Sequence, residues 1–259
     1  MLALVLLATR PLEPHRVGDA PNTIRVLFIG NSYTYVNNLP GLIIELAAYE
    51  PRPLDAEMIV EGGATLANHW TEGKALAAIR RGHWEYVVLQ EQSTLGSGIV
   101  INDIDQIGDP ANFYVAVRRF DAEIRKGGAR TVLFLTWARQ NAPQNQTLLT
   151  QAYTNIAREL HVVVSPVGPA WQVARITDSS LALHQSDGSH PTSTGSYLAA
   201  CVFYATFYRK SPIGLPAHVS SRLVDDSGNL QVGEADLNPA DALLLQQIAW
   251  QVVSLQQPF

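Results

Sequence analysis

One stretch near the start of the chain, residues 24–34 (IRVLFIGNSYT), decides the predicted fold. Five of its first six residues are apolar and several are β-branched, a pattern typical of a strand buried on both faces. Gly30 closes this strand, and Ser32 follows in a turn that leads to an apolar helix. Open α/β sheets bind their ligands at such turns, so Ser32 is a candidate nucleophile. The same residue types also build ordinary turns, and on its own the stretch favours that interpretation.

A second stretch, residues 183–192 (LHQSDGSHPT), supplies the groups that a nucleophilic serine needs. A serine hydroxyl is a weak nucleophile, so a histidine must take its proton and a carboxylate must orient that histidine. Asp187 and His190 lie three residues apart, close enough for both to face one serine. The glycine and the proline of the stretch would equally well form a solvated turn.

Together the two stretches resemble the SGNH hydrolases, also called GDSL esterases and lipases. Residues 30–32 (GNS) resemble the first sequence block of that family, with Asn31 in place of the commoner aspartate. Residues 187–191 (DGSHP) resemble the last block, in which the aspartate and the histidine complete a catalytic triad. The resemblance therefore implies a triad made of the serine of the first block and these two residues.

Two middle blocks can be matched in the family's order. Residues 61–65 (EGGAT) follow a predicted strand, and Gly63 falls where the second block supplies an oxyanion-hole backbone N–H. Residues 90–93 (QEQS) follow the next predicted strand, where the family usually has Gly-x-Asn-Asp and uses the asparagine as the third oxyanion donor. Gln92 matches that asparagine. A glutamine amide has the same donors but is one methylene longer, so the hole requires a displaced backbone.

The chain alternates between strand and helix patterns. Strands are expected at residues 24–29, 56–60, 86–89, 131–136 and 162–165, and helices at residues 39–49, 66–81, 113–126, 147–160, 193–208 and 239–253. This order predicts an α/β fold: a flavodoxin-like three-layer αβα sandwich around a central, mostly parallel five-stranded sheet. Residues 209–238 are expected to be irregular, with a short hairpin near residues 226–229.

The α/β-hydrolase fold is an alternative framework for a serine nucleophile. Its nucleophile elbow requires Gly-x-Ser-x-Gly, whereas Thr34 occupies the last position here. The elbow also follows several strands, whereas Ser32 follows the first predicted strand. Both differences favour the SGNH interpretation.

Composition and charge exclude several classes of function. The chain has 259 residues, of which 47% are hydrophobic and 16% are charged, which predicts one large domain over residues 23–259. A net charge of -5 without basic runs argues against nucleic acid as a partner. No histidine or cysteine spacing indicates a metal site, and no cofactor is expected. The sequence does not fix the oligomeric state.

Residues 1–22 are interpreted as an N-terminal tail or the remnant of a signal segment. The apolar run at residues 2–8 is too short to span a bilayer, so no stable membrane insertion is expected. The run resembles the core of a secretory signal, although no basic residues precede it. This favours a secreted or periplasmic protein, with a cytoplasmic protein as the alternative.

Several other polar residues fall near the predicted site. Trp137 and Arg139 follow the fourth strand, where an indole and a guanidinium suit a polar, saccharide-like substrate. A packed indole and a surface ion pair would explain them equally well. Asn31 is a further candidate for substrate binding. His69 is expected to pack against a helix, and Glu91 is expected to be a structural hydrogen-bond acceptor.

The predicted activity is the hydrolysis of a carboxylic ester through a covalent serine ester. In this mechanism Ser32 attacks the carbonyl, His190 acts as base and then as acid, and Asp187 orients His190. The backbone N–H groups of Ser32 and Gly63, with the Gln92 side chain, hold the oxyanion.

The family resemblance implies ester substrates. Since no long apolar lid is visible, a small acyl group such as acetyl on a polar carrier such as a carbohydrate is favoured. Two alternatives remain: an acyltransferase that uses the same triad, and a non-catalytic protein of this fold that binds a carbohydrate or a partner.

Overall fold

The computed structural model describes residues 22–96 and 98–255. Its centre is a five-stranded sheet in which every pair of neighbouring strands is parallel. The strands are β1 (Ile24–Gly30), β2 (Leu54–Val60), β3 (Tyr86–Leu89), β6 (Arg130–Phe134) and β7 (Val163–Ser165), arranged in the order β2-β1-β3-β6-β7. The predicted five-stranded α/β sandwich is therefore confirmed. The order reverses between β1 and β3, which is where open sheets of this type form their binding crevice.

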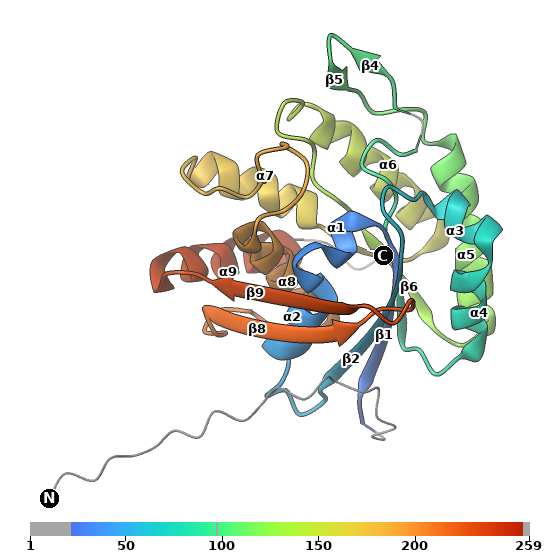
Figure 1. The fold of residues 1–259 in the computed structure, drawn as a ribbon, viewed down its shortest axis with the longest axis horizontal. Helices are drawn as coiled ribbons and strands as arrows, with labels where there is room; N and C mark the ends of the chain where they lie inside the picture. The colour runs from blue at the N-terminus through green and yellow to red at the C-terminus, as the bar shows by residue number, and fades with distance from the viewer. Residues whose placement is uncertain (1–21, 97, 256–259) are drawn as a thin grey trace, which may run out of the picture.

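Helices cover both faces of the sheet, which gives three layers (Figure 1). On one face lie α2 (Leu39–Leu46), α7 (Val167–Thr177), α8 (Ser193–Tyr208) and α9 (Pro239–Ser254), and on the other lie α3 (Leu66–Glu72), α4 (Lys74–Arg81), α5 (Ala111–Lys126) and α6 (Asn145–Leu160). The short helix α1 (Ser32–Tyr35) and the 3-10 turn η1 (Val36–Asn38) join β1 to α2.

The side chains of β1 explain why this strand lies at the centre. Val26 and Phe28 pack into the apolar cluster on the α8 side, whereas Leu27 and Ile29 pack into the cluster on the α5 side. All four are fully buried, as the continuous apolar run of the sequence predicts.

Helix α7 was not predicted from the sequence. Its first residues, Val167-Gly168-Pro169, contain two residue types that usually interrupt helices. Here the proline stands in the first turn, where its missing N–H would have had no intrahelical partner. The helix expected at residues 66–81 is in fact two helices, because Gly73 between α3 and α4 adopts a left-handed conformation with φ of 82°.

Residues 209–238 are more regular than expected. They contain an antiparallel hairpin of β8 (His218–Val224) and β9 (Leu230–Asp236), with its turn at the predicted place. Ser221 and Gly233 are paired at buried positions of the hairpin, so the apolar alternation that reveals a strand is lost there.

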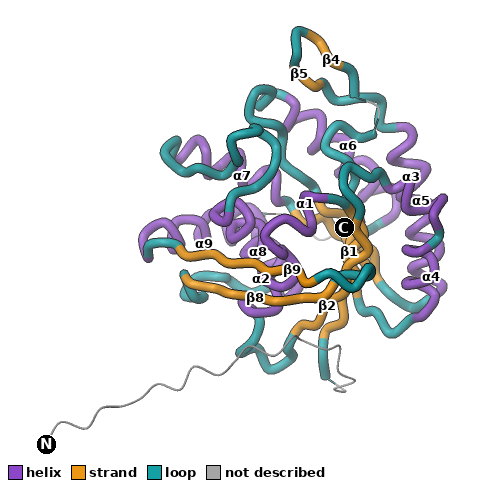
Figure 2. Tube along the Cα trace, viewed as in Figure 1, coloured by secondary structure: helices purple, strands orange, loops and turns teal. Residues whose placement is uncertain are grey.

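A second, very small hairpin was also missed by the sequence analysis. Strands β4 (Val100–Ile101) and β5 (Ile104–Asp105) form it, and it projects beyond the helical layers (Figure 2).

None of the helices in the described part of the chain combines the length and the apolar character needed to cross a bilayer. The apolar run at residues 2–8 lies outside the described residues.

Candidate active site

The structure brings Ser32, His190 and Asp187 together in one chain of hydrogen bonds. The distance from Ser32 Oγ to His190 Nε2 is 2.9 Å, and the distance from His190 Nδ1 to Asp187 Oδ2 is 2.5 Å. The other carboxylate oxygen of Asp187 accepts the backbone N–H groups of Ser189 and His190, at 2.8 and 3.0 Å. Asp187 therefore fixes both the histidine ring and the loop that carries it.

Asn31 holds Ser32 at the start of α1. Its side-chain oxygen caps the helix by accepting the Tyr33 N–H at 3.1 Å, and its amide nitrogen donates to the Ala64 carbonyl at 3.0 Å. The residue is only 3% exposed. Both ends of its amide are therefore engaged within the protein, and the geometry favours a supporting role over the substrate contact considered from the sequence.

Gln90 fixes the same turn from the end of β3, and sequence reasoning did not single it out. Its side-chain oxygen accepts the Asn31 N–H at 2.8 Å and the Thr34 hydroxyl at 2.9 Å. A Cβ atom on Gly30 would lie 2.4 Å from that oxygen, so a glycine is required where the two strands approach. The signal for Gln90 in the sequence was its place after a buried strand beside β1.

Three donors predicted for an oxyanion hole line one pocket with the serine. The Ser32 N–H belongs to the first residue of α1 and has no acceptor within the helix. Gly63 is exposed, with φ of 70°, and its N–H has no hydrogen-bond partner among the described residues. The side-chain oxygen of Gln92 accepts the N–H and the hydroxyl of Thr94, both at 2.7 Å. This commits the oxygen and leaves the amide nitrogen, 3.4 Å from Ser93 Oγ, as the available end.

Glu91 ties together the two loops that carry Gly63 and Gln92. One carboxylate oxygen accepts the Gln92 N–H at 2.7 Å, and the other accepts the Leu66 N–H at 3.2 Å. The residue is 2% exposed, and burial raises the pKa of Glu91 to about 7. Glu91 therefore acts as the structural hydrogen-bond acceptor expected from the sequence, and one of the N–H groups it accepts belongs to Gln92, a predicted oxyanion-hole residue.

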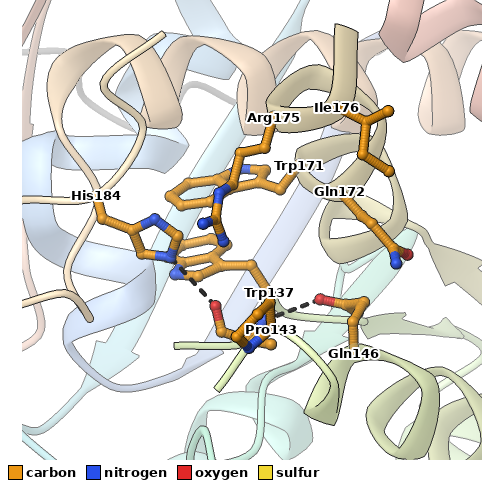
Figure 3. A pocket seen from close by; sticks show the side chains of 9 residues that line it. Trp137, Pro143, Gln146, Trp171, Gln172, Arg175, Ile176 and His184 are labelled. Carbon is orange, nitrogen blue, oxygen red and sulfur yellow. Dashed lines mark hydrogen bonds between the residues drawn. The ribbon is translucent and has the colours of Figure 1, made fainter. Parts of the chain in front are cut away.

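Trp137 is buried and does not line the Ser32 pocket. It is 1% exposed, and its indole N–H donates to the Ser189 carbonyl at 2.9 Å. The ring is stacked between Tyr33, at a centroid distance of 4.4 Å, and Trp171, at 3.9 Å. Trp137 therefore supports the loop of Asp187 and His190 and, on its other side, lines a separate cavity (Figure 3).

Arg139 does lie at the Ser32 pocket, as the sequence suggested. Its guanidinium forms an ion pair with Asp105 of β5 and hydrogen bonds to Ser93 Oγ at 3.2 and 3.4 Å. The small hairpin that carries Asp105 thus helps to set where this cation points.

The pocket has a volume of about 340 Å³, and both polar side chains and two tyrosines line it. Its lining residues are Asn31, Ser32, Tyr33, Tyr35, Gly62, Gly63, Gln92, Ser93, Arg139, Ser189 and His190. His69 lies outside it and is buried, with its Nε2 donating to the Gly30 carbonyl at the end of β1 at 2.7 Å. Within the described ranges, no group of three or more histidine, cysteine or acidic residues could hold a metal ion.

Comparison with known proteins gives matches among solved structures. A protein from Slackia heliotrinireducens assigned to the SGNH hydrolases is 25% identical, with a TM-score of 0.58 over 72% of this chain and 100% of that chain. A DUF4886 family protein from Bacteroides uniformis is 19% identical, with a TM-score of 0.65 over 90% of this chain and 95% of that chain. An acetyl-xylooligosaccharide esterase variant from Geobacillus is 14% identical, with a TM-score of 0.51 over 71% of this chain and 92% of that chain. No family model and no curated protein matches the sequence.

The buried carboxyl of Glu91 predicts a specific dependence of stability on pH. Its folded-state pKa of about 7 exceeds the ordinary value of 4.5, so between these pH values the folded protein holds a proton that the unfolded chain has lost. The stabilisation from this group is complete below about pH 4 and is lost as pH rises to about 7. Glu91→Gln replaces the ionisable carboxyl group with an amide that does not titrate. Relative to the wild type, the variant's free energy of unfolding should therefore rise by about 3 kcal/mol between pH 4 and pH 8.

Urea unfolding at several pH values, followed by circular dichroism, measures this difference. Glu72→Gln, at an exposed carboxylate of α3, is the matched control and should keep the pH dependence of the wild type. Parallel curves for Glu91→Gln and the wild type would contradict the assignment.

Proposed function

We propose that this chain, which has the fold of the SGNH hydrolases, hydrolyses carboxylic esters through a covalent ester on Ser32. The observation that carries the proposal is the continuous hydrogen-bond chain from Asp187 through His190 to Ser32. A serine in an ordinary turn has no need of a histidine held by a carboxylate. The site also lies at the carboxyl ends of β1 and β3, where the strand order reverses.

The arrangement of Ser32 and His190 suits each proton transfer that ester hydrolysis through an acyl-enzyme requires. As Ser32 Oγ attacks the carbonyl carbon, His190 Nε2 takes the hydroxyl proton. His190 returns that proton to the departing alcohol oxygen when the ester C–O bond breaks. A water molecule then attacks the acyl-enzyme, with His190 again as base, and Ser32 leaves with the proton.

Asp187 keeps its negative charge throughout these steps. The hydrogen bond from His190 is the main cause that lowers the pKa of Asp187 to about 2, so the carboxylate is ionised at neutral pH. It accepts a hydrogen bond from the Nδ1–H group of His190, which leaves Nε2 free to accept a hydrogen bond from the Ser32 hydroxyl. The same carboxylate stabilises the imidazolium that forms in each transition state.

The oxyanion is assigned to the Ser32 and Gly63 N–H groups and the Gln92 amide nitrogen. Preorganised donors of this kind stabilise the charge that develops on the carbonyl oxygen. Glu91 supports them by accepting hydrogen bonds from the backbone of the two loops that carry Gly63 and Gln92.

The substrate is proposed to carry a small acyl group, such as acetyl, on a polar carrier such as a carbohydrate. The pocket supports this because polar side chains, glycines and two tyrosines line it, without an aliphatic side chain for a long acyl group. One similar structure is an acetyl-xylooligosaccharide esterase. Ser32 and His190 are partly exposed, which favours water over a sugar alcohol as the acyl acceptor.

Replacing the nucleophile should abolish turnover. Ser32→Ala should lower kcat on a short-chain aryl ester by roughly four to six orders of magnitude, because the triad acts as a unit. Ser186→Ala, at an exposed serine of the same loop as His190, is the control and should retain activity. A fluorophosphonate probe should label the wild type and the control only. Hydrolysis by a folded Ser32→Ala protein, or an unlabelled wild type, would leave a non-catalytic binding protein as the better explanation.

The Gln92 side chain provides a second test. Gln92→Ala should lower kcat by about 10²- to 10³-fold with little change in KM, since the hydrogen bond strengthens as charge develops. Gln92→Asn keeps the donor but shortens its reach, so it should also be impaired. An unchanged kcat in Gln92→Ala, in a protein that labels normally at Ser32, would show that the third donor comes from elsewhere.

A further inference from the structure

A second cavity, lined in part by Trp137, shares no lining residue with the Ser32 pocket. Tyr33, which lines the Ser32 pocket, stacks on one face of Trp137, and Trp171 stacks on the other. The cavity has a volume of about 240 Å³. Its walls come from α7, from the connection between β6 and α6, from the start of α6, and from His184 of the loop that carries Asp187 and His190 (Figure 3).

Arg175 of α7 is the only arginine, lysine or acidic residue among the described residues that line this cavity. Figure 3 shows its guanidinium turned inward toward Trp137 and His184. Arg175 forms no ion pair or hydrogen bond with another described residue, whereas Arg139 at the Ser32 pocket is paired with Asp105. A partly buried guanidinium that lacks an acidic partner favours an anionic ligand, and its planar donors match a carboxylate.

His184 supplies an acceptor beside this cation. Its Nε2 donates to the Ala138 carbonyl at 3.1 Å, which leaves Nδ1 without a proton. Burial is the main cause that lowers the pKa of His184, and the neighbouring Arg175 lowers it further, so the ring stays neutral. A neutral Nδ1 can accept a hydrogen bond from a hydroxyl group. A ligand that suits both residues therefore carries a carboxylate and at least one hydroxyl.

The remaining walls suit a compact ring. Pro143 and Ile176 present exposed apolar surface, and Gln172 adds an exposed amide. Trp137 and Trp171, which are stacked on each other and 1% exposed, form the floor. A volume of about 240 Å³ is smaller than the sites of roughly 300–1,000 Å³ that hold drug-sized ligands. The space therefore suits one ring of a few carbon atoms and not an extended chain.

We propose that this cavity binds a single sugar ring that carries a carboxylate, in other words a uronic acid unit. Arg175 binds the carboxylate, His184 Nδ1 accepts from a ring hydroxyl, and the exposed apolar side chains of Pro143 and Ile176 contact the C–H groups of the ring. The site is distinct from the Ser32 pocket, and ligand binding there requires no turnover.

Titration of the full chain with glucuronate tests this proposal, with intrinsic tryptophan fluorescence and saturation-transfer NMR as readouts. Glucuronate should bind saturably, and glucose and benzoate, which lack the carboxylate and the hydroxyls respectively, should each bind at least about tenfold more weakly. Arg175→Gln should weaken glucuronate binding by about 10- to 100-fold, the effect of losing a charge-assisted contact. Arg158→Gln, at an exposed arginine of α6, makes the same change in charge and should bind like the wild type.

Two further variants locate the ligand. Arg139→Gln and Ser32→Ala alter the other pocket and should leave glucuronate binding unchanged, so the result does not depend on whether the chain is an esterase. Loss of binding in Arg139→Gln but not in a folded Arg175→Gln protein would place the ligand at Ser32 and overturn the proposal. Equal binding of glucose or benzoate, or no saturable binding of glucuronate, would overturn it as well.

Discussion

The site depends first on the two hydrogen bonds that the Gln90 side chain accepts from the turn after β1. They join the ends of neighbouring strands, and through Asn31 N–H and the Thr34 hydroxyl they fix the position at which α1 begins. This oxygen lies only 2.4 Å from where a Cβ atom of Gly30 would be, so the close approach of the Gln90 side chain to the strand end requires a glycine there. The predicted oxyanion donors and His190 are arranged around Ser32, whose position depends on where α1 begins.

Most of the fold could be predicted because its signals are local. A continuous apolar run such as residues 24–29 has few solutions other than a buried parallel strand, and the helices between such runs follow from periodicity. The missed elements are those in which tertiary packing outweighs local preference. Helix α7 begins with a glycine and a proline that fit its first turn, and the β8–β9 hairpin hides Ser221 and Gly233 where apolar residues would mark a strand.

The residues of the site divide in the same way. Ser32, Asp187 and His190 were recognisable because a serine follows the first buried strand, and an aspartate and a histidine three residues apart supply the partners that a nucleophilic serine needs. The structure brings these three side chains together. Asn31 and Trp137 carry the right chemistry for substrate contact, yet their side-chain N–H groups donate to the backbone carbonyls of Ala64 and Ser189 in distant loops. Only the folded chain shows such partners. Glu91 was predicted to be a hydrogen-bond acceptor, but its two donors, the N–H groups of Leu66 and Gln92, could not be predicted. These residues are 26 positions apart in the sequence, and the parallel sheet brings them together.

The column of stacked rings from Tyr33 through Trp137 to Trp171 has a consequence for the entropy of the reaction. Loops that carry acid–base residues are often disordered until substrate orders them, and the binding energy is then partly spent on that ordering. Here the loop with His190 rests on an aromatic column whose rings come from α1, from the segment after β6 and from α7, so the loop is already ordered when the chain folds. The binding free energy of a substrate then comes from its contacts with the protein, without a cost for ordering this loop. The enthalpy of binding should likewise contain little contribution from loop closure.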